Sequence, residues 1–222
     1  MTAVETVRRL LLISNSTLYG SGYLDHVEAE IKAFLGSVPR TVFIPFAVCD
    51  RRAYTEKAQE RFRTMGLELK SIHDVSNMER VVEEADSIFV GGGNTFRLLK
   101  GLYDCDLIAP IRESVASVTP YIGSSAGSVV ACPSLKTTKD MPVVQPPSFE
   151  ALSLVPFQLS PHYLDPDPSS THMGENSGGT DHTVPRRKHG DSSRFARGQS
   201  TSGAGRCRDS ERAQHRTNFQ TR

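Results

Sequence analysis

Ser125 lies in a sequence that is typical of a serine nucleophile, Gly123-Ser124-Ser125-Ala126-Gly127. A serine held on a sharp turn between a strand and a helix needs small residues two places before it and two places after it. Of the neighbouring serines, Ser125 is the one with glycine at both places. Such a turn exposes the hydroxyl and directs the N–H of Ala126 at the oxyanion of an acyl-transfer reaction. The spacing also fits a plain turn of small residues, so the interpretation depends on the surrounding elements.

A second glycine-rich segment, Gly91-Gly92-Gly93, precedes Asn94 at the end of another predicted strand. Glycines let backbone N–H groups approach an oxygen closely, and a helix that begins at Asn94 adds its positive end. We interpret Gly92, Gly93 and Asn94 as part of an oxyanion- and substrate-binding site, together with the Ala126 N–H. A phosphate cradle and a tight connection are the alternatives. However, no Gly-Lys-Ser/Thr follows, and Phe96 stands where a dinucleotide fingerprint has its third glycine.

A serine nucleophile needs a general base, and we favour His162 among the seven histidines. His162 follows the apolar stretch 152–159, from which a loop can return to Ser125, and His172 is the alternative. A carboxylate should fix the imidazole tautomer, and Asp140 gives the chain order Ser, Asp, His. The other candidate carboxylates are Asp165, Asp167 and Glu175. The remaining histidines are expected at the surface or in the C-terminal segment: His26, His73, His182, His189 and His215.

The segments around these residues alternate between predicted strands and helices. The strands are continuously apolar runs bounded by turn formers, at 10–13, 41–45, 67–72, 87–90 and 121–122. The helices are expected at 23–35, 54–65, 77–85, 94–99, 106–115 and 126–131, with Asn77, Asn94 and Asp106 as caps. This pattern predicts the α/β class, with a doubly wound, mostly parallel sheet flanked by helices. In that architecture reactive groups lie at the carboxyl ends of the strands.

Composition argues against several classes of partner. The chain has 222 residues, with 26 Lys and Arg against 25 Asp and Glu, so no strong charge field favours nucleic acid or a membrane surface. The first apolar run, Leu10 to Ile13, is too short for a signal-peptide core or a membrane span. The four cysteines have no CxxC spacing, so we expect neither a zinc site nor a disulfide framework. We expect a cytoplasmic protein without a metal.

The sequence changes character near residue 175. Residues 175–222 contain only seven apolar residues among 48, with ten Lys and Arg against five Asp and Glu and no helical or strand periodicity. Such a segment cannot bury enough apolar surface to offset its ordering entropy. We therefore predict a catalytic domain at 1–174, followed by a disordered basic tail rich in Ser, Gly and Arg at 175–222.

Four motifs in this order resemble the peptidase E family of α-aspartyl dipeptidases, over about residues 10–175: Val90-Gly91-Gly92-Gly93-Asn94-Thr95, Gly123-Ser124-Ser125-Ala126-Gly127-Ser128, Lys136-Thr137-Thr138-Lys139-Asp140-Met141-Pro142 and Pro161-His162-Tyr163-Leu164-Asp165. The resemblance implies a serine peptidase that hydrolyses Asp-X dipeptides without a cofactor, on a fold related to class I glutamine amidotransferases. It implies Ser125 as nucleophile, His162 as base, and Asp140 or a glutamate further along as the third member. The oligomeric state, monomer or homodimer, stays open.

The sequence departs from the family pattern after Gly174-Glu175, where Asn176-Ser177-Gly178-Gly179 follows and periodicity stops. We interpret this change as a shifted reading frame or an alternative exon. A transcript with one uninterrupted frame across 173–179, shared by closely related animals, would contradict that hypothesis. The family's remaining strands, the carboxylate for His162 and an arginine for the substrate aspartate would then be missing. A catalytically impaired variant, a cyanophycinase-like peptidase and a nucleotide-binding module are therefore the alternative functions.

Overall fold

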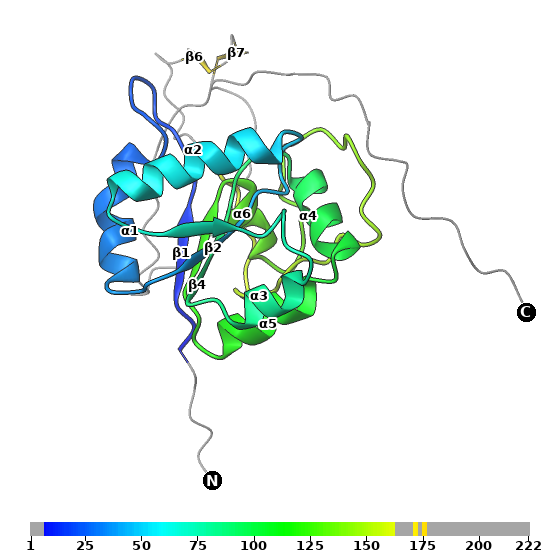
Figure 1. The fold of residues 1–222 in the computed structure, drawn as a ribbon. Helices are drawn as coiled ribbons and strands as arrows, with labels where there is room; N and C mark the ends of the chain where they lie inside the picture. Colours follow the sequence, from blue (N-terminus) through cyan, green and yellow to red (C-terminus); the bar gives the residue numbers. More distant parts are fainter. Residues whose placement is uncertain (1–6, 163–170, 173–174, 177–222) are drawn as a thin grey trace, which may run out of the picture.

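A five-stranded parallel sheet in the order β1-β5-β4-β2-β3 forms the centre of the molecule (Figure 1). The structure is a computed structural model and describes residues 7–162, 171–172 and 175–176. The strands are β1 Leu10–Ile13, β2 Thr41–Ile44, β3 Leu69–Ser71, β4 Ser87–Val90 and β5 Tyr121–Ser124. Two short antiparallel strands, β6 Thr171–His172 and β7 Glu175–Asn176, form a separate pair.

Helices cover both faces of the sheet. They are α1 Glu28–Leu35, preceded by the 3-10 turn η1 Asp25–Val27, then α2 Arg51–Thr64, α3 Met78–Glu83, α4 Thr95–Asp104, α5 Ile108–Ala116 and α6 Ala126–Val130. The predicted parallel α/β architecture is confirmed. Along the part of the chain described, no helix combines the length and apolarity that crossing a membrane requires.

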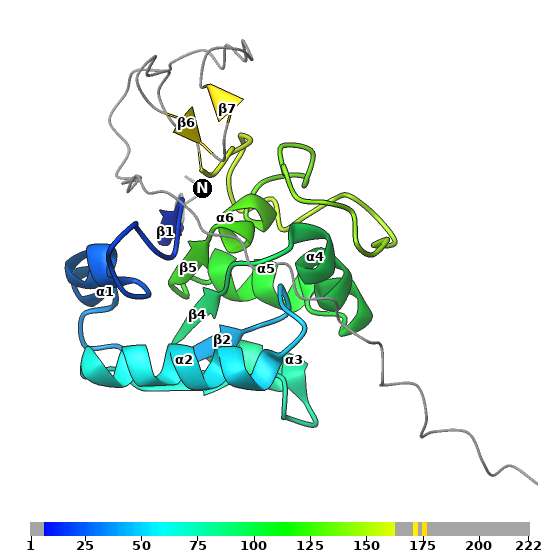
Figure 2. The same cartoon turned by 90° about the horizontal axis from the view of Figure 1, so that it is seen from above.

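The two faces have separate apolar cores because alternate strand residues point to opposite sides. Phe43 and Phe89 point to the face of α1 and α2, where Phe62 completes a stack of rings at centroid distances of 5.1 and 5.4 Å. Ile44 and Val90 point to the other face, which α3 to α6 cover. Figure 2 shows α1 and α2 on one side of the strands and α4, α5 and α6 on the other.

The helix starts show where local sequence rules hold. Asn77 and Asn94 accept hydrogen bonds from the N–H groups three residues on, as predicted for N-caps. The prediction that Asp106 caps α5 is wrong, because the N-cap is Leu107 and no side chain caps it. Asp106 instead has φ of 53° and donates its N–H to the Tyr103 carbonyl, so it closes α4.

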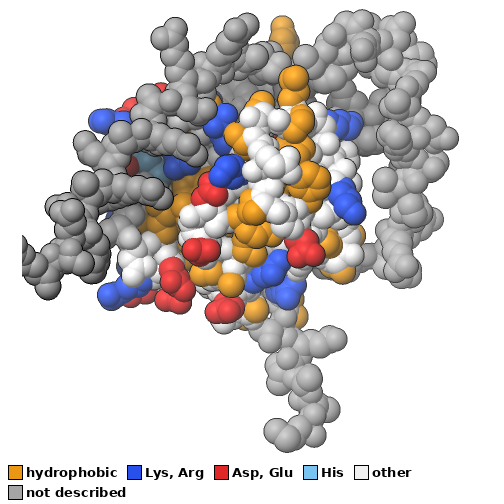
Figure 3. Space-filling view, turned by 90° about the vertical axis from the view of Figure 1, so that its right-hand side faces the viewer, with side chains coloured by type: hydrophobic (Ala, Val, Ile, Leu, Met, Phe, Trp, Pro, Cys, Tyr) orange, Lys and Arg blue, Asp and Glu red, His pale blue; other side chains and the backbone are white. Residues whose placement is uncertain are grey.

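The segment after α6, residues 131–162, folds back beside α6 and α5, and this return carries His162. Backbone N–H groups of Ala151, Leu152 and Leu154 donate to carbonyls of residues 130–133, next to α6. The Arg112 guanidinium also donates to two carbonyls of this segment. The face that carries α4 and this return shows a band of apolar side chains among charged ones (Figure 3). Four large apolar residues of the return are exposed: Met141, Val143, Phe149 and Phe157.

Candidate active site

Ser125 and His162 are adjacent in the structure, although 37 residues separate them in the sequence. The Ser125 Oγ lies 2.8 Å from the His162 Nε2, and both groups are partly buried. Ser125 follows β5 directly, at the carboxyl edge of the sheet. A hydroxyl within hydrogen-bond distance of an imidazole is the arrangement by which histidine activates serine for attack on a carbonyl.

The backbone at Ser125 is strained. Its φ of 51° and ψ of −107° lie outside the regions that non-glycine residues favour. A Cβ on Gly123 would stand 2.6 Å from the Gly127 carbonyl oxygen, and one on Gly127 would stand 2.2 Å from the Val90 carbonyl oxygen. Both positions of the motif therefore exclude any side chain. The Ser125 N–H donates to Ile13 O at 2.9 Å, which ties the turn to β1.

Hydrogen bonds of its own backbone and of the preceding segment hold His162 in place. The His162 N–H donates to the Ser14 Oγ at 2.9 Å, just beyond β1. Its φ of 61° marks a sharp turn at the end of the return. Three residues earlier, the Leu159 N–H donates to the Cys132 Sγ and its carbonyl accepts from the Thr137 hydroxyl. These bonds fix the segment that presents the imidazole to Ser125.

Cys132 lies behind the site but is not a competing nucleophile. Its side chain is fully buried next to α6. Burial raises the pKa of the thiol to about 11, against a weaker opposing effect of the hydrogen bond from Leu159. The thiol is therefore protonated near neutral pH, and a thiolate is the form that attacks carbonyls.

The glycine loop follows β4 and lies beside Ser125. A Cβ built on Gly92 would stand 3.1 Å from the Ser125 Cβ, so the two backbones are in close approach. The Gly92 N–H donates to the Tyr54 hydroxyl at 2.9 Å. Gly93 has φ of +136°, and a Cβ there would stand 2.6 Å from the Ala47 carbonyl oxygen. The loop geometry thus depends on glycine at both positions.

The helix that follows Ser125 supplies a backbone donor. Ala126 is the first residue of α6, where N–H groups have no partner within the helix. Of the predicted donors, Ala126 therefore lies at the start of α6, directly after Ser125, and Gly92 and Gly93 lie in the glycine loop after β4. The Asn94 side chain is engaged elsewhere, because its Oδ1 caps α4 and its Nδ2 donates to Met141 O at 2.8 Å.

Asp140 is positioned at the start of α4. Its Oδ2 accepts from the Thr95 N–H at 2.7 Å and from the Thr95 hydroxyl at 2.6 Å. A carboxylate at a helix N-terminus is favourable because the helix dipole is positive there. The role of Asp140 in orienting His162 stays a prediction. Asp165, Asp167 and the side chains of His172 and Glu175 lie outside the described residues.

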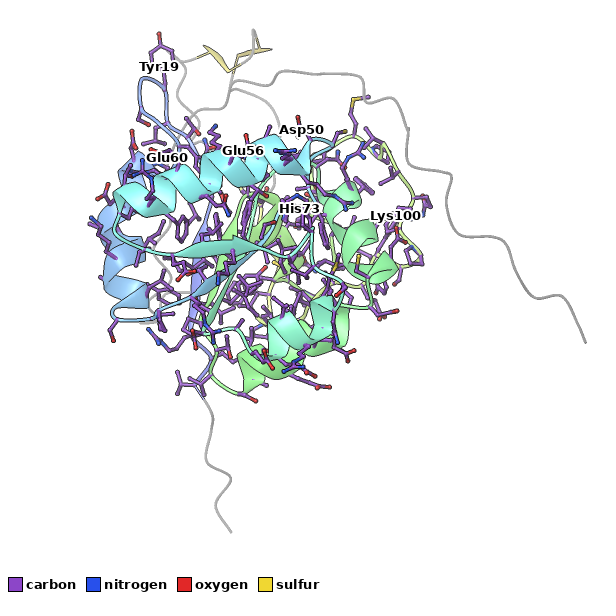
Figure 4. The ribbon with its side chains drawn as sticks, viewed as in Figure 1. Tyr19, Asp50, Glu56, Glu60, His73 and Lys100 are labelled. Atoms are coloured by element: carbon purple, nitrogen blue, oxygen red, sulfur yellow. The ribbon has the colours of Figure 1, made fainter. Side chains whose placement is uncertain are left out.

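A depression lies at the β3 edge, away from Ser125. It has a volume of about 480 Å³, and its lining includes Ser71 as well as Glu56 and His73, which are labelled in Figure 4. The His73 Nδ1 lies 2.6 Å from the Ser71 Oγ, and its Nε2 lies 3.1 Å from the Asp74 Oδ2. His73 is half-buried where it lines this depression, with its side chain 10% exposed. Arg52 pairs with Glu56 in the same depression, so these charges compensate each other.

Two groups that hold the site have no signal in the local sequence. They are the Tyr54 hydroxyl, 38 residues from Gly92, and the Ser14 hydroxyl, 148 residues from His162. Ser14 ends an apolar strand run, so only its place at a strand's carboxyl end could have suggested a role.

Across the described residues, no group of three or more His, Cys, Asp or Glu side chains could hold a metal ion.

Comparison with known proteins identifies relatives of this chain. Residues 10–189 match peptidase family S51. The chain is 48% identical over 166 residues to a peptidase E of Streptomyces coelicolor, covering 75% of this chain and 68% of that protein. It is 47% identical over 175 residues to the Drosophila melanogaster protein named "Probable alpha-aspartyl dipeptidase", covering 78% and 73% respectively.

A solved structure agrees with these sequence matches. A crystal structure of a protein assigned to peptidase E in Listeria monocytogenes EGD-e superposes with a TM-score of 0.59 at 28% identity. The superposition covers 70% of this chain and 79% of that one. The parallel sheet described above is therefore shared with a solved member of that group.

Proposed function

Because this chain belongs to peptidase family S51, we propose that it is a serine dipeptidase that hydrolyses dipeptides with an N-terminal aspartate. The observation that carries the proposal is the 2.8 Å approach of the Ser125 Oγ to the His162 Nε2 at a strained strand-to-helix turn. The relative from Drosophila melanogaster, named for α-aspartyl dipeptidase activity, supports the choice of substrate.

The proposed reaction is acyl transfer to Ser125. The Ser125 oxygen attacks the peptide carbonyl carbon while the His162 Nε2 accepts the hydroxyl proton. The N–H groups of Ala126 and of the glycine loop stabilise the oxyanion that forms. His162 then gives its proton to the leaving amine, and the peptide C–N bond breaks. Water, deprotonated by His162, attacks the acyl-enzyme; the acyl C–O bond then breaks, His162 returns the proton to the Ser125 oxygen, and aspartate leaves.

The glycine loop offers two candidate donors, and the contacts favour one of them. The Gly92 N–H is already donated to the Tyr54 hydroxyl, which leaves the Gly93 N–H as the next donor along the loop. We therefore assign the oxyanion to Gly93 and Ala126. For the aspartyl side chain of the substrate, the candidate cations are Arg97 in the first turn of α4 and the exposed Lys139, which lie near the motifs in the sequence.

Hydrolysis of Asp-Leu by the full chain tests the proposal. Ser125→Ala should lower kcat by a factor on the order of 10⁶, the loss typical when a triad serine is removed. Ser124→Ala is the matched control, because the Ser124 hydroxyl is buried and has no hydrogen-bond partner among the described residues. Its removal should leave the rate within about twofold, since no hydrogen bond is lost. Equal rates for Ser125→Ala and the wild type would contradict the assignment.

An impaired enzyme is the second candidate, because the sequence departs from the family pattern after Gly174-Glu175. A folded protein that hydrolyses neither Asp-Leu nor a polymeric aspartyl substrate would favour this candidate. Hydrolysis of the polymer alone would favour a cyanophycinase-like activity. Hydrolysis of Asp-Leu, with Ala-Leu left intact, is the result that we expect.

A further inference from the structure

Two tyrosines meet behind the glycine loop, on the side away from α4. Tyr54, in the first turns of α2, has its hydroxyl 3.2 Å from that of the buried Tyr23. The Tyr54 ring packs edge-on against Phe43, with ring centroids 5.2 Å apart, and edge-on against Tyr23 at 6.0 Å. The ring is therefore held by core contacts that do not involve its hydroxyl.

The Tyr54 hydroxyl touches the loop at two successive glycines. It accepts the Gly92 N–H at 2.9 Å. A Cβ on Gly91 would stand 2.7 Å from the same oxygen, so the loop fits against it only without a side chain. On its other side, Gly92 approaches the Ser125 Cβ. One hydroxyl thus connects α2 to the peptide beside the nucleophile.

This hydrogen bond determines which donor the loop can offer. Three successive glycines have more accessible backbone conformations than any other tripeptide, so the loop needs an outside constraint to hold one N–H toward a substrate. While the Gly92 N–H is given to Tyr54, the peptide group between Gly91 and Gly92 is held in place, and its Gly92 Cα is the point from which the next peptide group, between Gly92 and Gly93, begins. The N–H of that peptide group is the one assigned to the oxyanion above.

We propose that Tyr54 is a positioning residue for acyl transfer at Ser125. The Tyr54 hydroxyl accepts the Gly92 N–H and thereby orients the Gly93 N–H toward the oxyanion. The proposal rests on the proposed function. Burial raises the pKa of Tyr54 and that of Tyr23, so both hydroxyls stay neutral at the pH at which a histidine base works. The acceptor is therefore present throughout that pH range.

Tyr54→Phe tests the proposal, because it keeps the ring contacts and removes the acceptor. The oxyanion interaction is stronger in the transition state than in the bound substrate, so its loss lowers kcat with little change in KM. Loss of a whole oxyanion donor costs about 10²–10³ in rate, so a misplaced donor should cost about tenfold or more. We expect kcat for Asp-Leu to fall by about 10- to 100-fold, with KM changed by less than about threefold.

Two other tyrosines provide matched controls. Tyr103→Phe removes a tyrosine hydrogen bond to the Glu150 carbonyl, at the far end of α4, and should leave kcat within about twofold. Tyr23→Phe disturbs the tyrosine pair but leaves the bond between Tyr54 and Gly92 in place, so kcat should stay near the wild-type value. A loss in Tyr23→Phe equal to that in Tyr54→Phe would assign the effect to the contact between the two tyrosine hydroxyls, not to the bond with Gly92, and would overturn the proposal.

Amide hydrogen exchange gives a readout that does not depend on activity. In the wild type the Gly92 amide should be protected, and in Tyr54→Phe it should exchange at least about tenfold faster, because a lost hydrogen bond opens it to water. If the Gly92 amide exchanges without protection in the wild type, that measurement alone overturns the proposal, and no variant is needed. An inactive wild type would overturn the proposed function, whereas an active wild type with unchanged kcat in Tyr54→Phe would overturn the positioning role alone.

Discussion

At the scale of single residues, the two glycines around Ser125 act as steric requirements of the turn. Gly127→Ala would place a Cβ 2.2 Å from the Val90 carbonyl oxygen, which belongs to the backbone of a central strand and cannot rotate away. Overpacking of this kind costs about 1–3 kcal/mol, and we expect the upper end of that range. Because relief requires the turn to move, kcat should also fall. Urea unfolding and Asp-Leu hydrolysis measure the two effects.

Gly22→Ala is the control for this prediction. A Cβ on Gly22 would meet the Asp25 Oδ2 at 2.6 Å, which is the end of a side chain that can turn. The unfolding free energy should then change by less than about 1 kcal/mol, with kcat unaffected. A Gly127→Ala variant as stable and active as Gly22→Ala would show that the turn tolerates a side chain.

At the scale of elements, the strands and the starts of α3, α4 and α6 were predictable because apolar runs, caps and glycine turns are local signals, whereas α1 begins at Glu28 instead of residue 23 and α2 at Arg51 instead of residue 54. Helix ends were also less predictable: α4 was expected to end at Leu99 but continues to Asp104. Gly101 weakens the helix signal, yet it lies where a Cβ would stand 2.9 Å from the Phe46 Cβ, so tertiary packing selects the glycine. The nucleophile turn was likewise predictable from spacing, whereas the Tyr54 and Ser14 contacts come from folding distant segments together.

The start of α4 yields a prediction about Asp140. Asp140→Ala removes the acceptor of both Thr95 hydrogen bonds, and we expect the free energy of unfolding to fall by about 1–2 kcal/mol, as for a lost helix cap. Asp140→Asn retains one acceptor oxygen and should lose less. Denaturant titration measures these values, and an unchanged stability in Asp140→Ala would contradict the capping role.

The same pair of variants tests the catalytic prediction for Asp140. A carboxylate that orients the base loses about 10⁴ in kcat when it becomes an amide. A loss of this size in Asp140→Asn, with stability nearly retained, would support Asp140 as the third member beside Ser125 and His162. A loss of kcat below about tenfold would limit the role of Asp140 to capping the start of α4.

At the scale of the whole molecule, we propose that residues 1–174 form the catalytic domain and that 175–222 add nothing to its core. The described core already covers both faces of the sheet with residues between Leu11 and Leu159. Residues 175–222 contribute only seven apolar side chains. The family match, however, extends to residue 189, so the boundary needs a direct test.

Two shortened chains, ending at Gly174 and at His189, separate these possibilities. If the proposed boundary is right, both should unfold with the same free energy as the full chain to within about 0.5 kcal/mol, because removing solvated residues takes no apolar surface from the core. Thermal and urea unfolding measure this, with Asp-Leu hydrolysis as the functional readout. A chain ending at Gly174 that is clearly less stable than the one ending at His189 would move the boundary to include 175–189. A loss of stability in both would place part of the core beyond His189.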